Sequence, residues 1–144
     1  LYFDTRLSAD NTVSCASCHH PDHAFTDGKP VSSGIKSQKG GRSAPSVINR
    51  AYGQLQFWDG RANSLEDQAG GPMQNPIEMG NTHAAVVKTV ASIAGYRPLF
   101  KAAFGSDEIN IDLITKAIAT YERTVLSGNS PYDRYKAGNK KALT

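Results

Sequence analysis

The only two cysteines of the chain stand three positions apart and are followed at once by a histidine, in Cys15-Ala16-Ser17-Cys18-His19. Two thiols at this spacing can each form a thioether with one vinyl group of the same haem. The adjacent imidazole then reaches the iron as an axial ligand. The pentapeptide therefore predicts one covalently attached c-type haem, with His19 as the proximal ligand of its iron.

Three other uses of the two thiols compete with haem attachment: a redox-active CxxC, a structural disulfide and half of a zinc site. A thioredoxin-like CxxC expects a βαβ setting, which this sequence does not predict. A zinc site with four cysteines is impossible, and one with two histidines would need His20, His23 or His83 at unusual spacing. We retain haem attachment, which depends on export machinery and implies a periplasmic location.

A c-type haem serves electron carriers as well as enzymes, and the sixth coordination position of the iron distinguishes them. A carrier fills that position, commonly with Met or His, whereas a catalyst keeps it open for its substrate. The sequence offers five candidate ligands: Met73, Met79, His20, His23 and His83. His23 is the preferred histidine, although a solvated side chain is the simpler interpretation of all three.

The segment that carries the haem motif predicts loops. From Leu7 to Arg42 it is rich in Ser, Gly, Asp, Asn and Pro and has no sustained hydrophobic period. Loops of this length are uncommon in a small domain. A covalent cofactor explains this one, because its apolar surface gives the loop something to pack on.

Helix signals are concentrated in the second half of the chain. Caps and hydrophobic periodicity predict helices from Asn81 or Thr82 to Gly95, from Tyr96 to Phe104, from Asn110 to Gly128 and from Pro131 to Ala137. The residues expected to face inward are Val86, Val87, Val90, Ile93, Leu99, Phe100, Phe104, Ile111, Ile114, Ile118, Tyr121 and Val125. No strand pair is predicted, so the expected fold is all-α: a cytochrome c-like domain with long loops around its haem.

Composition limits the remaining classes. A chain of 144 residues with 39% hydrophobic and 20% charged residues has the size and polarity of one globular domain. No apolar run approaches the roughly 20 residues that span a bilayer. The net charge of +3 is spread along the chain, and its one basic cluster, Lys36 to Arg42, has no aromatic residue. We therefore expect neither a membrane span nor nucleic-acid binding.

The two ends of the sequence lack the signals of a complete exported protein. The chain starts at Leu1 with no Met and no leader, and it stops at Thr144 without a terminal signal. We expect it to be a fragment of a longer protein.

Three stretches together resemble the bacterial di-haem cytochrome c peroxidases and their MauG-type relatives. They are Leu7 to Asn11 leading into the haem motif, Ala44-Pro45-Ser46-Val47, and the block from Phe57 to Met79. The block is the specific part, with Phe57-Trp58-Asp59-Gly60-Arg61, Gln68, Gly71-Pro72 and Ile77-Glu78-Met79. The resemblance implies that residues 1–144 form the amino-terminal, peroxidatic haem domain, which in that family precedes a second haem domain.

The resemblance also implies a role for individual side chains. It places Gln68, Pro72 and Glu78 on the distal side of the haem, where peroxide meets iron, and directs Trp58 towards the second haem. Glu78 would act as base and then as acid, while Gln68 would orient the peroxide. Without the resemblance, Glu78 is an exposed loop carboxylate and Trp58 a core residue.

Next to Trp58, Asp59 and Arg61 form a local ion pair or hold a haem propionate; the sequence leaves both open.

Two positions depart from the family pattern. Ile35 stands where classical members carry a loop histidine that caps the peroxidatic iron. Since Ile cannot bind iron, we expect a haem that is five-coordinate or water-bound at rest and reacts without reductive activation, as in the MauG-type relatives. Ser43 stands where the family has an Asn that binds calcium between the two domains. Calcium is therefore a possible ligand, although this chain matches the family's set of calcium ligands incompletely.

Three functions follow as hypotheses. The first is reduction of hydrogen peroxide to water, with electrons that pass through the second haem from a small c-type cytochrome or a blue-copper protein. The second is MauG-like oxidation of a protein or organic substrate, and the third is a monohaem electron carrier. The resemblance is also compatible with a homodimer. A chain that lacks haem altogether is the remaining alternative.

Overall fold

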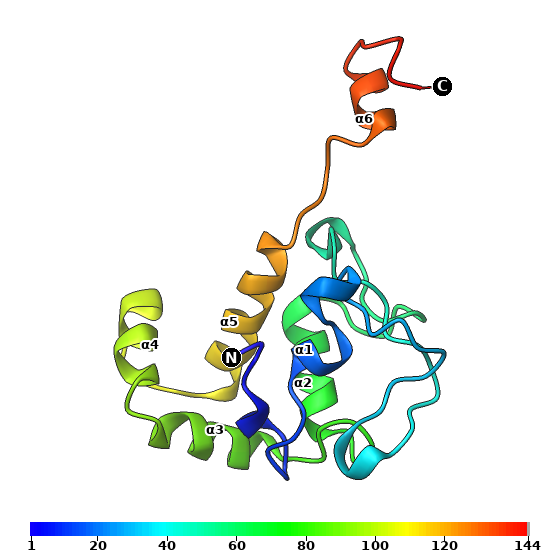
Figure 1. Ribbon diagram of the computed structural model, residues 1–144. Coiled ribbons are helices and arrows are strands. Elements are labelled where there is room, and N and C mark those ends of the chain that lie inside the picture. Colours follow the sequence, from blue (N-terminus) through cyan, green and yellow to red (C-terminus); the bar gives the residue numbers. More distant parts are fainter. Residues whose placement is uncertain (144) are drawn as a thin grey trace.

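The computed structural model describes residues 1–143 and is built from helices and loops (Figure 1). The described chain has no strand, only three isolated β-bridges. The α-helices are α1 (Cys15–Cys18), α2 (Leu65–Gln74), α3 (His83–Ser92), α4 (Tyr96–Phe104), α5 (Ile111–Thr124) and α6 (Pro131–Lys136). The 3-10 helices are η1 (Thr5–Leu7), η2 (Pro21–His23), η3 (Ile35–Ser37) and η4 (Arg50–Tyr52). The all-α class with long loops is confirmed.

Helices α2 and α5 pack against each other at the centre of the molecule. The side chain of Asn110 caps α5 by accepting a 2.9 Å hydrogen bond from the Leu113 N–H. Ser64 caps α2 by accepting a 3.0 Å hydrogen bond from the Asp67 N–H. The sequence does not predict α2, because its second half contains Gly70-Gly71-Pro72. Its buried face repeats with helical spacing at Leu65, Ala69, Gly70 and Met73, and this packing outweighs the weak propensity.

The four predicted helices of the second half end close to the expected residues. Thr82 caps α3, which ends at Ser92, before Gly95. Gly105 closes α4 in the left-handed conformation, with φ of 74°. Helix α5 ends at Thr124, and α6 follows an extended segment that separates it from the other helices in Figure 1.

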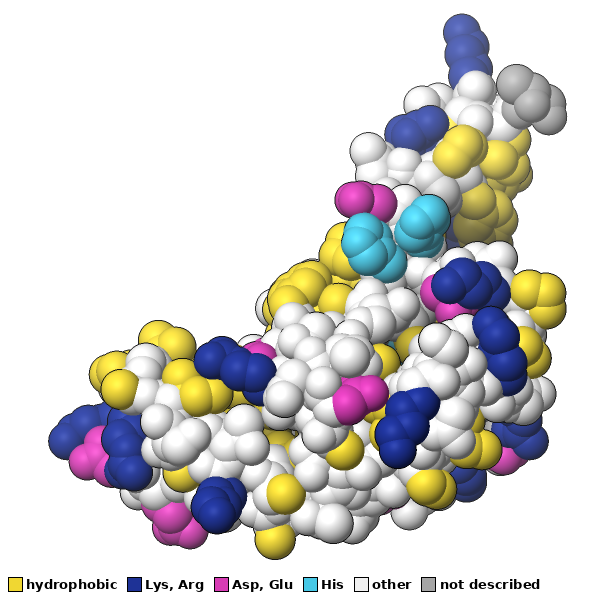
Figure 2. All heavy atoms as spheres, turned by 60° about the horizontal axis from the view of Figure 1, so that its bottom comes forward, with side chains coloured by type: hydrophobic (Ala, Val, Ile, Leu, Met, Phe, Trp, Pro, Cys, Tyr) yellow, Lys and Arg dark blue, Asp and Glu magenta, His cyan; other side chains and the backbone are white. Residues whose placement is uncertain are grey.

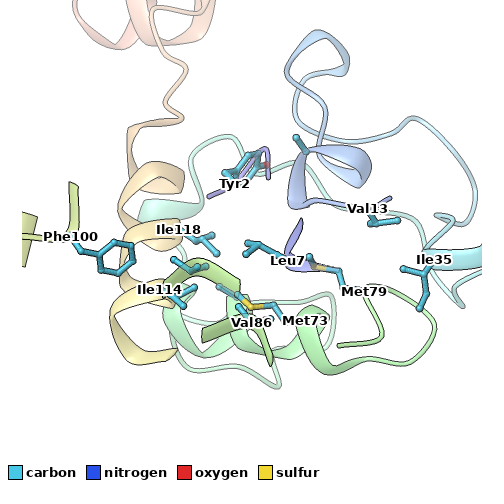
Figure 3. Packing of buried hydrophobic residues seen from close by; sticks show 13 residues of the cluster. Tyr2, Leu7, Val13, Ile35, Met73, Met79, Val86, Phe100, Ile114 and Ile118 are labelled. Carbon is cyan, nitrogen blue, oxygen red and sulfur yellow. The ribbon is translucent and has the colours of Figure 1, made fainter. Parts of the chain in front are cut away.

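One hydrophobic core joins these helices to the N-terminal loops. Figure 3 shows Ile114 and Ile118 of α5 beside Leu7, with Met73 and Val86 close by. Most residues expected to face inward are buried or partly buried. Leu99 is the exception, since it is 62% exposed and only Phe100 of its helix is buried. The prediction for Leu99 was wrong because α4 contacts the rest of the molecule along a narrow stripe.

Lys and Arg side chains are spread across the face in Figure 2, among acidic and neutral ones. None of the helices within residues 1–143 has the length and apolar character needed to cross a membrane.

Candidate active site

A cavity of about 530 Å³ lies between the haem motif and the central helices. Helix α1, the loop of residues 40–47, the loop of residues 56–61, α2, residues 77–79 and α5 all contribute to its wall. This volume lies in the range of about 300–1,000 Å³ that is usual for cofactor sites. Cys15, Cys18 and His19 all line it.

The imidazole of His19 is held from one side by backbone carbonyls. Its Nδ1 atom lies 3.0 Å from the Pro45 oxygen and 3.3 Å from the Phe25 oxygen, so Nδ1–H donates and Nε2 is left to bind a metal. Burial lowers the pKa of His19 and keeps the ring neutral, as a ligand must be. The Tyr2 hydroxyl donates a 3.2 Å hydrogen bond to the His19 carbonyl and fixes the backbone.

Both cysteines are free thiols that face the cavity. Burial raises the pKa of Cys15 to about 12, so the thiol is not activated for redox exchange. A c-type haem needs two thiols for its vinyl groups and an imidazole nitrogen for its iron. The residues present therefore fit a c-type haem. The imidazole of His19, held by carbonyl oxygens at Nδ1, would bind its iron through Nε2.

Gln68, Pro72 and Glu78, the three residues assigned to the distal side, line the same cavity as His19. Gln68 and Pro72 come from successive turns of α2, and Glu78 comes from the turn that follows it. The Asn75 amide donates a 3.0 Å hydrogen bond to Oε1 of Glu78. Burial raises the pKa of Glu78, while the charge of Arg61 and the Asn75 hydrogen bond oppose that shift.

The backbone of Glu78 is held by the loop that contains Ile35. The Ile35 N–H donates a 2.8 Å hydrogen bond to the Glu78 oxygen. A side chain at Gly34 would collide with the carbonyl oxygens of Ile77 and Glu78, so the approach requires glycine. Ile35 itself is buried in the core near Met79 (Figure 3) and does not line the cavity.

Residues 57–61 form a loop at the cavity that is closed by backbone hydrogen bonds between Gln56 and Ala62. Asp59 accepts hydrogen bonds of 2.8 Å from both Arg42 and Arg61. These hydrogen bonds lower the pKa of Asp59 to about 2, and the cluster of three carries one net positive charge. The ion pair expected for Asp59 and Arg61 is therefore present, and it leaves a charge that suits an anionic propionate.

Trp58 is 64% exposed, so its interpretation as a core residue is wrong. Its indole N–H donates a 2.9 Å hydrogen bond to the Ser43 oxygen, which fixes the ring at the edge of the cavity.

The sequence profile of the family described as di-haem cytochrome c peroxidase matches residues 1–141. The chain belongs to this family.

The similar proteins include both cytochrome c peroxidases and MauG proteins. The chain is 48% identical to the cytochrome c551 peroxidase of Nitrosomonas europaea over 143 residues, 99% of this chain and 43% of that protein. It is 41% identical to the methylamine utilization protein MauG of Methylophilus methylotrophus over 144 residues, 100% of this chain and 43% of that protein. The chain thus spans less than half the length of these relatives.

Two solved structures resemble this chain over nearly its whole length. A MauG-like protein associated with microbial copper homeostasis superposes with a TM-score of 0.88 at 38% identity, over 100% of this chain and 43% of that one. The diheme peroxidase BthA of Burkholderia thailandensis gives a TM-score of 0.79 at 27% identity, over 99% of this chain and 41% of that one. These likenesses confirm the cytochrome c-like fold of a di-haem peroxidase.

Most of the remaining candidate iron ligands do not line the cavity. His20 and His23 are exposed and do not line it, so the preference for His23 gains no support. The Nε2 of His83 lies 2.9 Å from the Gly70 oxygen, outside the cavity wall. Met73 is in the core, and Met79 alone of the five lines the cavity.

The sequence missed three polar residues in or next to the cavity, Arg42, Asn75 and Glu122. Asn75 stands three positions before Glu78 in a turn, a spacing that could have indicated the contact. Glu122 lines the cavity from α5, four residues after Ile118 and three before Val125, so the helical period of the core positions could have indicated an inward side chain. Within residues 1–143, no group of three or more His, Cys, Asp or Glu side chains is placed to hold a further metal ion.

Proposed function

We propose that this chain is the peroxidatic haem domain of a cytochrome c peroxidase, which reduces hydrogen peroxide to water. The observation that carries the proposal is that the Glu78 carboxyl and the Gln68 amide share one cavity with His19, whose Nε2 is free. The cavity also holds the two thiols of the haem motif. The family membership and the names of the relatives support the same activity.

The haem, when bound, supplies the iron and the electrons that break the O–O bond. Glu78 takes the proton from the peroxide oxygen nearer the iron and returns it to the oxygen that leaves as water. Burial raises the pKa of Glu78, which favours the protonated form that returns the proton. Gln68 orients the peroxide through its amide without adding charge, and Pro72 forms the apolar wall beside it. Two electrons and two protons convert one peroxide into two waters.

The loop of residues 57–61 serves the edge of the haem in this proposal. Arg61 and Arg42, with one net positive charge after pairing with Asp59, hold a propionate. The exposed Trp58 ring passes electrons from a second haem domain, and the di-haem description of the family supports this part of the proposal.

We infer an iron that is open or water-bound at rest. Ile35 cannot coordinate, and it is turned into the core rather than into the cavity. Met79 is the one remaining candidate for the sixth position. A low-spin, six-coordinate ferric spectrum that Met79→Leu converts to high spin would assign the ligand and refute an open site.

The partners belong to the same proposal. The donor is a small c-type cytochrome or a blue-copper protein in the periplasm, and the working protein is compatible with a homodimer. Calcium shared with the second domain would use Ser43, which lies near the edge of the cavity beside Trp58. Its other ligands would come from outside this chain.

The test is Glu78→Gln in the complete, haem-loaded protein, assayed with peroxide and reduced cytochrome c. Loss of the acid and base lowers kcat/KM by about 10²–10⁴ while the haem spectrum is retained. Asp22→Asn is the matched control, because the Asp22 side chain is 87% exposed and lies outside the cavity. Full peroxidase activity in the Glu78 variant would refute the proposal.

A MauG-like oxidation of a protein or organic substrate is the second candidate, favoured by Ile35 and by the 41% identity to MauG. Slow turnover with reduced cytochrome c, together with fast oxidation of such a substrate, would select it. The monohaem carrier predicts instead that cyanide binds slowly to the ferric protein.

A further inference from the structure

Glu122 is a buried carboxyl in the wall of the haem cavity. It lies on the inner face of α5, one turn beyond Ile118 and Ala119, and only 4% of the residue is exposed. It lines the cavity, and its Oε2 atom is buried without a hydrogen-bond partner. Buried polar groups are almost always partnered, so an orphaned carboxyl oxygen points to a role that this chain alone does not satisfy.

The charged groups around Glu122 are already engaged. Arg123 follows it on α5 but donates hydrogen bonds of 2.6 and 3.0 Å to Glu66 of α2. Arg50 of η4 lines the same cavity and donates a 2.9 Å hydrogen bond to the Gln56 side chain. No cation among the described residues is therefore paired with the Glu122 carboxyl.

The other neighbours of Glu122 supply no compensating charge. Leu65 and Ala69 of α2 line the cavity beside it, and Tyr2 and Cys15 each have a pKa that the nearby Glu122 charge helps to raise. Burial raises the pKa of Glu122 to about 7; Glu66 adds to this shift, and Arg123 opposes it. Near neutral pH the carboxyl is thus poised between its two protonation states.

A haem in this cavity changes its charge by one unit between ferrous and ferric iron. In a low-dielectric wall, a positive charge favours ionisation of a neighbouring carboxyl, and loss of that charge favours its protonation. We propose that Glu122 is the proton-linked residue of this haem: its carboxylate takes one proton from water when one electron enters, and releases it when the electron leaves. Charge balances, because the donor's electron and the solvent proton arrive together.

The linkage would keep the net charge of the buried cavity constant during turnover. The linkage acts through the electrostatic field of the carboxyl and requires no contact with peroxide. Glu122 therefore compensates the charge of the haem and is neither the acid nor the base of the peroxide reaction. The inference rests on the haem of the proposed function and is independent of the peroxidase step.

The experiment is a reductive titration of the complete, haem-loaded protein from about pH 5 to about pH 9. In the wild type, the equilibrium constant for reduction falls by up to tenfold for each unit of pH around neutrality, because reduction binds a proton. Glu122→Gln abolishes that dependence, since the amide cannot ionise. Glu66→Gln is the matched control and retains it.

Two outcomes would overturn the linkage: a pH-independent wild-type equilibrium, or a Glu122→Gln variant with the wild-type dependence. If Glu122→Gln fails to fold, the infrared difference spectrum of the wild type decides. The C=O band of a protonated carboxyl must grow on reduction, and its absence refutes the inference. A protein without haem absorbance would instead refute the proposed function.

Discussion

The Asn75 side-chain amide donates a 3.0 Å hydrogen bond to Oε1 of Glu78, while its own oxygen accepts a 3.0 Å hydrogen bond from the Ile77 N–H. One residue therefore shapes the turn after α2 and stabilises the ionised form of the carboxyl at its end. The two functions use different atoms of the amide, so an isosteric substitution can separate them.

Asn75→Asp is predicted to keep the turn and to raise the pKa of Glu78. The new carboxylate still accepts from Ile77, but it removes the donor that lowers the pKa and adds a like charge. Because Glu78 must be ionised to accept a proton, the acidic limb of the pH profile of kcat/KM moves to higher pH. An unchanged acidic limb would show that another group controls it.

Gly34→Ala is predicted to destabilise the protein by about 1–3 kcal/mol, because the added methyl group collides with the Ile77 and Glu78 carbonyl oxygens. Peroxide turnover should fall as well, since the collision displaces the backbone of Glu78. Gly41→Ala, in the same loop, is the control: nothing lies within 4 Å of the added methyl group. Urea unfolding measures the stability of the two variants. Equal stabilities would contradict the close packing of Gly34 against the Ile77 and Glu78 carbonyl oxygens.

The sequence was most informative where a local signal and the packing agree. Helices α3, α4 and α5 carry capping residues and a hydrophobic period, and their bounds lie within a few residues of those predicted. Helix α2 was missed because Gly70, Gly71 and Pro72 disfavour helix, and packing against α5 and α3 stabilises it. Long-range packing of this kind leaves no mark in a local window.

The residues of the site likewise differ in whether a local signal or tertiary packing determines their position. The haem motif is contiguous, so Cys15, Cys18 and His19 could be assigned from chemistry alone. The sequence places Glu122 next to Arg123 on an amphipathic helix, but adjacent residues of a helix do not face each other, so no ion pair between them is expected. Arg123 pairs with Glu66, and the rotation of α5 turns Glu122 into the cavity. That orientation depends on tertiary packing.

Trp58→Phe is predicted to slow reduction of the His19 haem by the electron donor while leaving stability within about 1 kcal/mol. The ring is exposed, and the substitution removes one hydrogen bond, from the indole N–H to the Ser43 oxygen. Stopped-flow mixing with reduced donor measures the electron step, and direct mixing with peroxide serves as the control that should not change. Wild-type rates of electron entry would exclude Trp58 from the path.

Glu122 is predicted to make the protein less stable as pH rises. Its pKa is about 7 in the folded protein against an ordinary value of 4.5, so the folded state binds the proton more tightly than the unfolded chain. The stability that this provides is complete below about pH 4.5 and is lost as pH rises through about 7. Glu122→Gln removes the loss, because the amide stays neutral.

Urea unfolding of the haem-loaded protein measures this effect. Between pH 5 and pH 8, the free energy of unfolding of Glu122→Gln should rise relative to that of the wild type by on the order of 1–3 kcal/mol. Glu66→Gln is the contrasting variant. In the wild type, the hydrogen bonds from Arg123 lower the pKa of Glu66. The stability that the Glu66 carboxylate contributes is therefore present at high pH and lost on acidification. A Glu122→Gln advantage that does not change with pH would mean that the buried carboxyl is compensated by a group outside residues 1–143.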